Sequence, residues 1–285
     1  MAQSPSAAAA DSARAPGPAQ DTPLVDTHFH LYLRDMPLTG WAWHHPPEDA
    51  TAEQFLSVMD AHGVGFGVVA AASLHGDYHD YTVRSLRRHK RLRGTVFLRP
   101  ETDLYTMERM KADGIVGIRL FFRRVPNPPD LRSAEYRLLL RRVRDLGWHV
   151  HTLVGSPMLP DIIAAMEEAG VKLVIDHMGH PDPAQGVNCP GFRAMLAAVE
   201  RGRTWVKLSA GFRVASPEAA RAHARALLAV AGGERLVWGS DWPFAAFEGR
   251  VTYADTITAL RDWVPDAALR RQITGDTPMR LYFAE

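Results

Sequence analysis

The sequence has 285 residues, of which 46% are hydrophobic, and its formal net charge is +1. A near-neutral chain without a basic tract lacks the charge pattern of proteins that bind nucleic acid or an anionic membrane surface. No apolar run reaches the roughly 20 residues that span a bilayer, and the single cysteine, Cys189, cannot form an internal disulfide. We therefore expect a soluble protein of the cytoplasm, with no nucleic-acid or membrane partner.

Residues 1–23 are rich in Ala, Pro and Ser and contain almost no large apolar side chain. Such a segment buries too little apolar surface to offset the entropy lost when it is ordered. We predict a disordered tail over residues 1–23 and one folded domain over residues 24–285.

From Leu24 onward, short β-branched runs alternate with longer helical patterns, most of which end at a glycine. This alternation is typical of strand–helix units around a parallel sheet. Eight strands are predicted: 24–30, 65–72, 93–98, 117–122, 149–154, 172–177, 204–208 and 236–240. Eight units, in a chain long enough for the roughly 250 residues of such a fold, favour a closed (β/α)8 TIM barrel. An open doubly wound sheet is the alternative, but no G-x-G-x-x-G turn follows an early strand.

Imidazole and carboxylate side chains gather at the predicted strand ends. In a barrel of this kind the active site lies at the carboxyl ends of the strands, and alternate residues of a strand share a face. The residues concerned are His28 and His30, His149 and His151, Asp176 and His177, and Asp241. Neutral imidazoles and a carboxylate are suitable donors for a divalent metal such as zinc. His149, the deeper of its pair, is interpreted as a hydrogen-bonded core residue.

Seven short motifs occur in order along the chain: DTHFH, SLHG, GIRLFF, LGWHV, VIDHMGHPD, VKLS and VWGSDWP. Together they resemble the amidohydrolase superfamily, in the branch that contains 2-pyrone-4,6-dicarboxylate lactonase and related lactonases. The resemblance implies a barrel hydrolase whose reaction centre is His28, His30, His177 and Asp241, with Asp241 as the base that activates water. It also implies that Arg119 and Arg213 bind substrate carboxylates and that Ser73 adds a hydrogen bond. The alternatives are a barrel-closing ion pair for Arg119 and a solvated loop position for Arg213.

The chain departs from the pyrone lactonase pattern at four points. Leu153 stands where that enzyme, which is understood to work without a metal, has a tyrosine, and Phe244 stands where it has a histidine. The second arginine of its carboxylate clamp corresponds to Arg123 or Arg124, of which Arg124 is preferred. His151 occupies the position where metal-using relatives place a ligand. These departures favour a metal-dependent relative that acts on a different lactone.

The sequence thus predicts a hydrolase that opens the ring of a carboxylated lactone by metal- and Asp-assisted attack of water. The predicted ligands of zinc, or alternatively manganese, are His28, His30, His151, His177 and Asp241, and a metal-free mechanism stays open. A metal-dependent decarboxylase of a hydroxylated aromatic acid, and a binding protein that has lost catalysis, are the alternatives. The expected partner is a small carboxylated substrate, and a homo-oligomer is possible.

Several other residues are interpreted by their place in the pattern. The loop with Trp41, Trp43, His44 and His45 is predicted to form a lid or a subunit contact. Asp26 is predicted to orient its neighbours or to cap a backbone turn, and Trp242 and Pro243 to shape the turn that presents Asp241. The remaining histidines are assigned as follows: His180 to the pocket, His75 and His79 to solvated loop positions outside the site, and His62, His89 and His223 to the surface.

Overall fold

The computed structural model describes residues 22–125 and 127–284. Nearly all of the predicted tail, residues 1–23, lies outside the described residues. Within the described part, no helix has both the length and the apolar character that are needed to cross a membrane.

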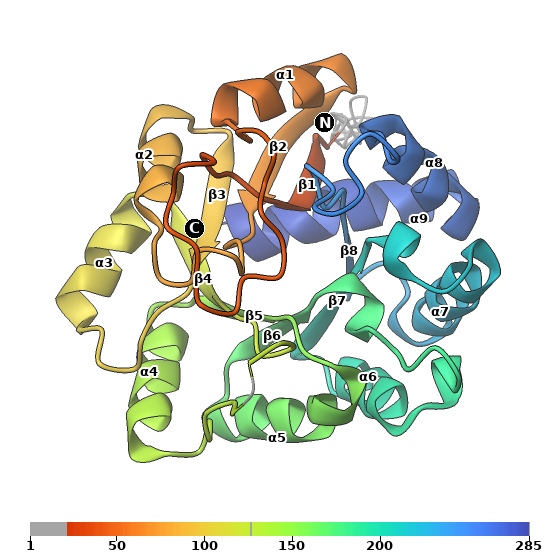
Figure 1. Ribbon diagram of the computed structural model, residues 1–285. Helices are drawn as coiled ribbons and strands as arrows, with labels where there is room; N and C mark the ends of the chain where they lie inside the picture. The colour runs from red at the N-terminus through yellow and green to blue at the C-terminus, as the bar shows by residue number, and fades with distance from the viewer. Residues whose placement is uncertain (1–21, 126, 285) are drawn as a thin grey trace, which may run out of the picture.

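Eight parallel strands form one sheet whose spatial order is the order of the chain. The strands are β1 (Leu24–Phe29), β2 (Val64–Val69), β3 (Leu92–Val96), β4 (Ile115–Leu120), β5 (His149–Thr152), β6 (Lys172–Ile175), β7 (Thr204–Ser209) and β8 (Leu236–Gly239). Just beyond β8, the amide of Asp241 donates to the carbonyl of His28 at 2.8 Å, and Trp242 pairs with Phe29. The last strand therefore meets the first, and the predicted (β/α)8 barrel and its eight strands are confirmed (Figure 1).

Helices surround the barrel and alternate with the strands (Figure 1). They are α1 (Ala52–Ala61), α2 (Asp80–Arg88), α3 (Leu104–Ala112), α4 (Ala134–Asp145), α5 (Leu159–Ala169), α6 (Pro190–Glu200), α7 (Pro217–Ala231), α8 (Tyr253–Trp263) and α9 (Ala267–Arg271). Side-chain caps fix where several begin: Thr51 and Thr252 each form a capping box at the start of α1 and α8. Gly170, with a φ of 69°, ends α5 in the left-handed conformation that favours glycine.

The first strand is oriented by an aromatic contact on its outer face. Phe29 is fully buried and stacks on Phe55 of α1, with ring centroids 3.6 Å apart. Because successive side chains of a strand point to opposite faces, this contact turns His28 and His30 toward the barrel interior.

Replacement of Phe55 by Ala is expected to lower the free energy of unfolding by about 3–5 kcal/mol, because a large buried ring is lost and leaves a cavity. Urea unfolding followed by circular dichroism would measure the change. Tyr105→Ala is the matched control, since this aromatic side chain is 69% exposed and its loss is expected to cost no more than about 0.5 kcal/mol. Equal stability of the two variants would contradict the proposed packing role.

The interior of the barrel also holds an apolar cluster, in which residues of the strands pack against residues near the C-terminus. Val25, Val68, Val174 and Val237 pack there with Leu281 and Tyr282. His149 lies beside this cluster, buried, with its Nε2 atom 2.7 Å from the carbonyl oxygen of Leu281. The interpretation of His149 as a hydrogen-bonded core residue is confirmed.

Candidate active site

A pocket opens at the carboxyl ends of the strands, where the barrel fold places active sites. Many of the residues singled out in the sequence line it: His30, Ser73, Arg119, Arg124, His177, His180, Arg213 and Asp241. His28 lies beneath them, fully buried.

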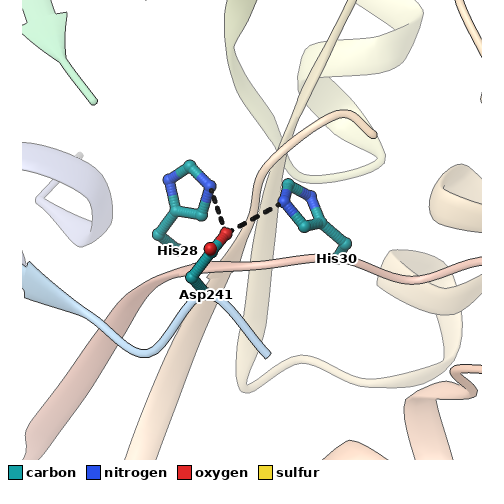
Figure 2. Close-up of side chains that lie close together, drawn as sticks. All are labelled: His28, His30 and Asp241. Atoms are coloured by element: carbon teal, nitrogen blue, oxygen red, sulfur yellow. Dashed lines mark ion pairs between the residues drawn. The ribbon is translucent and has the colours of Figure 1, made fainter. Parts of the chain in front are cut away.

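His28, His30 and Asp241 converge at the centre of the site (Figure 2). The Nε2 atoms of His28 and His30 lie 3.5 Å and 3.4 Å from Oδ1 of Asp241. On the other side of its ring, His30 Nδ1 lies 2.8 Å from the carbonyl oxygen of Ala70. That carbonyl can only accept, so Nδ1 carries a proton, and Nε2 of a neutral His30 presents its lone pair to the site.

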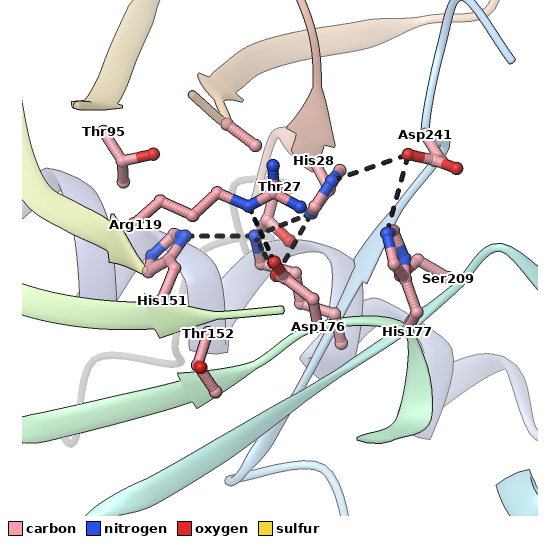
Figure 3. A network of polar contacts seen from close by, with 12 residues as sticks. Thr27, His28, Thr95, Arg119, His151, Thr152, Asp176, His177, Ser209 and Asp241 are labelled. Carbon is pink, nitrogen blue, oxygen red and sulfur yellow. Dashed lines mark hydrogen bonds and ion pairs between the residues drawn. The ribbon is translucent and has the colours of Figure 1, made fainter. Parts of the chain in front are cut away.

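His177 brings a third imidazole to the same carboxylate oxygen (Figure 3). Its Nε2 atom lies 3.7 Å from Oδ1 of Asp241, while its Nδ1 atom makes a 2.8 Å hydrogen bond with the hydroxyl of Ser209. The structure thus brings together the four residues that the resemblance assigned to the reaction centre.

The backbone at this centre is locally strained. His177 and Asp241 have φ angles of 51° and 67°, a region that non-glycine residues rarely adopt and that is common at functional sites. Gly239 precedes this turn, and a Cβ atom there would overlap the Cβ of His28. Only glycine allows β8 to lie this close to β1.

The charge of Asp241 is set by opposing effects. Burial alone would raise the pKa of its carboxyl group, but the positive charge of Arg213 and the contacts with the neighbouring imidazoles outweigh that effect and hold the pKa well below 3.8. Arg213 Nε donates to Oδ2 of Asp241 at 2.7 Å, which leaves Oδ1 facing the imidazoles. Asp241 is therefore ionised at neutral pH.

Two of the imidazoles around Asp241, those of His28 and His177, are neutral at that pH. Burial, with a smaller contribution from the positive charge of Lys207, lowers the pKa of His28 to about 3. Burial likewise holds the pKa of His177 well below 6.5. Neutral imidazoles can each present one lone pair and one N–H group to a ligand.

His28, His30 and Asp241 fit a divalent metal by donor type and by spacing. Two ligands of a tetrahedral zinc ion with bonds of about 2.1 Å lie about 3.4 Å apart, close to the separations of the Nε2 atoms from Oδ1 of Asp241. His28 Nε2 is, in addition, a buried nitrogen that finds no hydrogen-bond partner among the residues described.

His151 lies one layer deeper, and the structure places it with Lys207 instead of with these three residues. Its Nδ1 atom is 3.1 Å from the ammonium nitrogen Nζ of Lys207, and it does not belong to the cluster whose ligand atoms lie within 4.8 Å of one another. Its role as a metal ligand stays a prediction, one that the neighbouring cation opposes.

Arg119 is almost fully buried although it lines the pocket. Its Nε atom donates to Oδ2 of Asp176 at 2.8 Å, and Nη1 donates to the carbonyl of Ala71 at 2.6 Å. The ion pair that was the alternative for Arg119 is therefore present, and substrate binding by this residue stays a prediction.

A family model described as amidohydrolase matches residues 25–284. The chain belongs to the amidohydrolase family. The resemblance inferred from the seven motifs is confirmed, and it extends over the whole barrel.

The curated relatives of this amidohydrolase include lactone hydrolases. It is 27% identical to a 4-sulfomuconolactone hydrolase of Hydrogenophaga intermedia over 269 residues, covering 90% of this chain and 88% of the relative. It is 26% identical to a 2-pyrone-4,6-dicarboxylate hydrolase of Comamonas testosteroni, covering 92% and 90% of the two chains.

A solved structure agrees with this relationship. An Acinetobacter baumannii protein, suggested to be a 2-pyrone-4,6-dicarboxylic acid hydrolase and crystallised with citric acid, superposes with a TM-score of 0.87. The two proteins are 27% identical, and the match covers 92% of this chain and 99% of the other.

The rim of the amidohydrolase pocket is cationic and aromatic. Arg123, Arg124 and Arg213 line it together with Trp43. The guanidinium carbons of Arg124 and Arg213 lie 5.0 Å and 5.9 Å from the centre of the Trp43 ring, within the range of cation–π contacts. An anionic ligand would meet several positive charges at this rim.

The loop between β1 and α1 lies in front of the strands, in red and orange (Figure 1). Trp41 and Trp43 of this loop line the pocket, and His44 Nε2 lies 2.6 Å from Oε1 of Glu248, in the loop after β8. This placement agrees with the lid, one of the two predictions made for the loop.

Asp26 has the orienting role that the sequence predicted. Its Oδ1 atom accepts hydrogen bonds from the amides of His28 and Ser240, at 3.0 Å and 3.1 Å. Its Oδ2 atom accepts one from the hydroxyl of Tyr253 at 3.0 Å. One carboxylate therefore joins β1 to the end of β8. Beyond it, Trp242 and Pro243 are joined by a cis peptide bond.

Two predictions about the other histidines are wrong. His223 is not a surface residue, because it falls on the buried stripe of α7 with Ala220, Ala224 and Leu227. His75 is not solvated, because its ring is buried with Nδ1 2.9 Å from the carbonyl of Pro37. Three further assigned histidines, His62, His79 and His89, are half-buried.

Sequence reasoning missed Lys207 as a member of the site, although it lies inside the motif VKLS. The lysine is fully buried on β7, between Val206 and Leu208. A charged residue in the middle of an otherwise buried strand is rare unless it is paired. This unusual position of a lysine was the signal from which the sequence could have indicated a role for Lys207 in the site.

Proposed function

We propose that this amidohydrolase opens the ring of a lactone that carries one or more carboxylate or similar anionic groups. The observation that carries the proposal is the position of the Asp241 carboxylate, which faces three imidazoles within a pocket whose rim holds three arginines. The lactone hydrolases among the relatives support it, since the named substrates carry sulfonate or carboxylate groups.

In this proposal His28, His30 and Asp241 would hold a divalent metal, zinc or manganese, with His177 beside it. When bound, such an ion would polarise the lactone carbonyl and lower the pKa of a water molecule toward about 7. Asp241 accepts the proton of the attacking water and returns it to the ring oxygen that leaves, so that one residue serves as base and then as acid.

Arg213 connects substrate binding to this proton transfer. In the structure its guanidinium is bonded to Asp241, and it also lines the pocket. A substrate carboxylate that binds Arg213 competes with Asp241 for the same cation. Because Arg213 is then shared between two carboxylates, it stabilises the charge of Asp241 less, and Asp241 becomes a stronger base when substrate is present.

The proposed activity is tested with a panel of pyrone, muconolactone and sugar-acid lactones, each offered as the free acid and as the methyl ester. Ring opening of a free-acid lactone, with weaker activity on its ester, is the expected result. Failure to open any lactone, or release of CO₂ from a hydroxylated aromatic acid in place of ring opening, would contradict the proposal.

Replacement of Arg124 by Gln is expected to raise KM for a carboxylated lactone by about 10- to 100-fold, the effect of losing a hydrogen bond between charged groups. The methyl ester should show little change. Arg132→Gln is the control, because Arg132 is an exposed arginine paired with Glu168 away from the pocket. Equal loss on acid and ester would rule out recognition of charge by Arg124.

A further inference from the structure

Lys207 lies at the centre of the barrel, where three side chains of the described chain surround its ammonium group. Its Nζ atom is 3.0 Å from Nδ1 of His28, 3.1 Å from Nδ1 of His151 and 3.0 Å from Oδ1 of Asp176. Lys207 is fully buried, as are His28 and His151. Figure 3 shows these three partners turned toward one another inside the sheet.

The chemistry of the ammonium group determines which atoms carry protons here. An ammonium has three N–H donors and no acceptor, so each imidazole nitrogen that it contacts must offer a lone pair. Nδ1 of His28 is then unprotonated, and the ring proton lies on Nε2, the atom that faces Asp241.

Asp176 competes with Lys207 for the same nitrogen. Its Oδ1 atom lies 3.2 Å from Nδ1 of His28; if it accepted a proton from Nδ1, Nε2 would be left with a lone pair for a metal, the arrangement common behind metal-bound histidines. The geometry favours the lysine, because its ammonium nitrogen lies 3.0 Å from Nδ1 with hydrogen-bond geometry, whereas the 3.2 Å contact of Asp176 Oδ1 with Nδ1 is an ion-pair contact without that geometry.

We propose that Lys207 is a positioning residue that holds His28 with its proton on Nε2, so that His28 donates a hydrogen bond into the pocket and the cluster of His28, His30 and Asp241 binds metal weakly. Metal binding at His28 Nε2 requires the proton to move to Nδ1, where it would point at an ammonium group 3.0 Å away. The positive charge of Lys207 also repels a second cation in the same buried site.

Lys207 belongs to the site of the proposed function, but the tests of its role use no lactone. The role of Lys207 and the lactonase activity can therefore fail independently of each other. The first is the nitrogen-15 NMR spectrum of the imidazoles in metal-free wild-type protein, with His28 assigned by the signal that a His28→Gln variant lacks. A protonated Nε2 and an unprotonated Nδ1 are expected. A proton on Nδ1 overturns the proposal, and this measurement does not depend on whether any lysine variant folds.

The second test is zinc affinity, measured at neutral pH by competition with a chromophoric chelator. Lys207→Met, which removes the cation and keeps a side chain of similar length, is expected to bind zinc about 10- to 100-fold more tightly, the scale on which partners of metal-bound histidines act. Unchanged or weaker zinc binding by the folded variant overturns the proposal.

His151→Asn is the matched variant for this measurement, because it removes the other imidazole partner of Lys207 and leaves the contact with His28 in place. Its zinc affinity should stay close to that of wild type. Loss of zinc binding in His151→Asn would instead identify His151 as a ligand and overturn the role given to Lys207.

Discussion

Replacement of Asp241 by Asn is expected to lower kcat/KM for lactone hydrolysis by about 10²- to 10⁴-fold, the range attributed to a general acid–base group. Asn has nearly the same shape and can still accept the hydrogen bond from Arg213. It cannot take a proton from water at neutral pH, and it is a weaker donor for a metal. Steady-state kinetics on the lactone that the panel identifies would measure the loss.

The control for this variant is Asp145→Asn, an exposed carboxylate at the end of α4 that pairs with Arg141 and Arg144. Its kinetics should match those of wild type. Circular dichroism should show that Asp241→Asn keeps the barrel. Near-normal turnover by a folded Asp241→Asn protein would remove Asp241 from the mechanism.

Replacement of Arg119 by Met is expected to lower the free energy of unfolding by about 3–5 kcal/mol, the cost of breaking a buried ion pair by removing one partner. The guanidinium is almost fully buried and bonded to Asp176 and to the Ala71 carbonyl. Its loss leaves a buried carboxylate oxygen and a carbonyl without their donors. Urea unfolding would measure the change.

Arg124→Met is the matched variant, because Arg124 lines the same pocket but is exposed. Its stability should differ from wild type by no more than about 0.5 kcal/mol. Should Arg119→Met keep wild-type stability and raise only KM, Arg119 would be a substrate ligand, as the resemblance implied, and not a structural ion pair.

The fold could be predicted from the sequence because each strand–helix unit has a recognisable local sequence pattern. Eight short β-branched runs alternate with helical patterns, most of which end at a glycine, and parallel strands closed by helices are the arrangement that buries the apolar faces of both. The predicted strand 65–72 compares with Val64–Val69 in the structure, so differences are confined to strand ends. In this strand the apolar pattern continues through residues 70–72, all alanine, beyond the last residue of the strand.

The site could be predicted only in part, since a strand end gives the position of a residue but not its depth in the barrel or its partners. Asp241 and His177 reach the pocket, as their motifs indicate. His151 does not join the central cluster, because its strand carries it below the pocket to Lys207. Arg119 likewise forms an ion pair with Asp176. The sequence alone could not identify Asp176 as the partner of Arg119.

The hydrogen bonds of Asp26 join the two ends of the barrel, since the amide of Ser240 that it holds is 214 positions further along the chain. His28 and Asp241 flank this seam, so the reaction centre comes into existence only when the barrel shuts. A nascent or truncated chain that lacks the eighth strand has no such centre, however well its other units form. Conversely, a ligand that bridges His28 and Asp241 would hold the first and last strands together. It would raise the free energy of unfolding of the whole domain by an amount that grows with the logarithm of the ligand concentration relative to Kd.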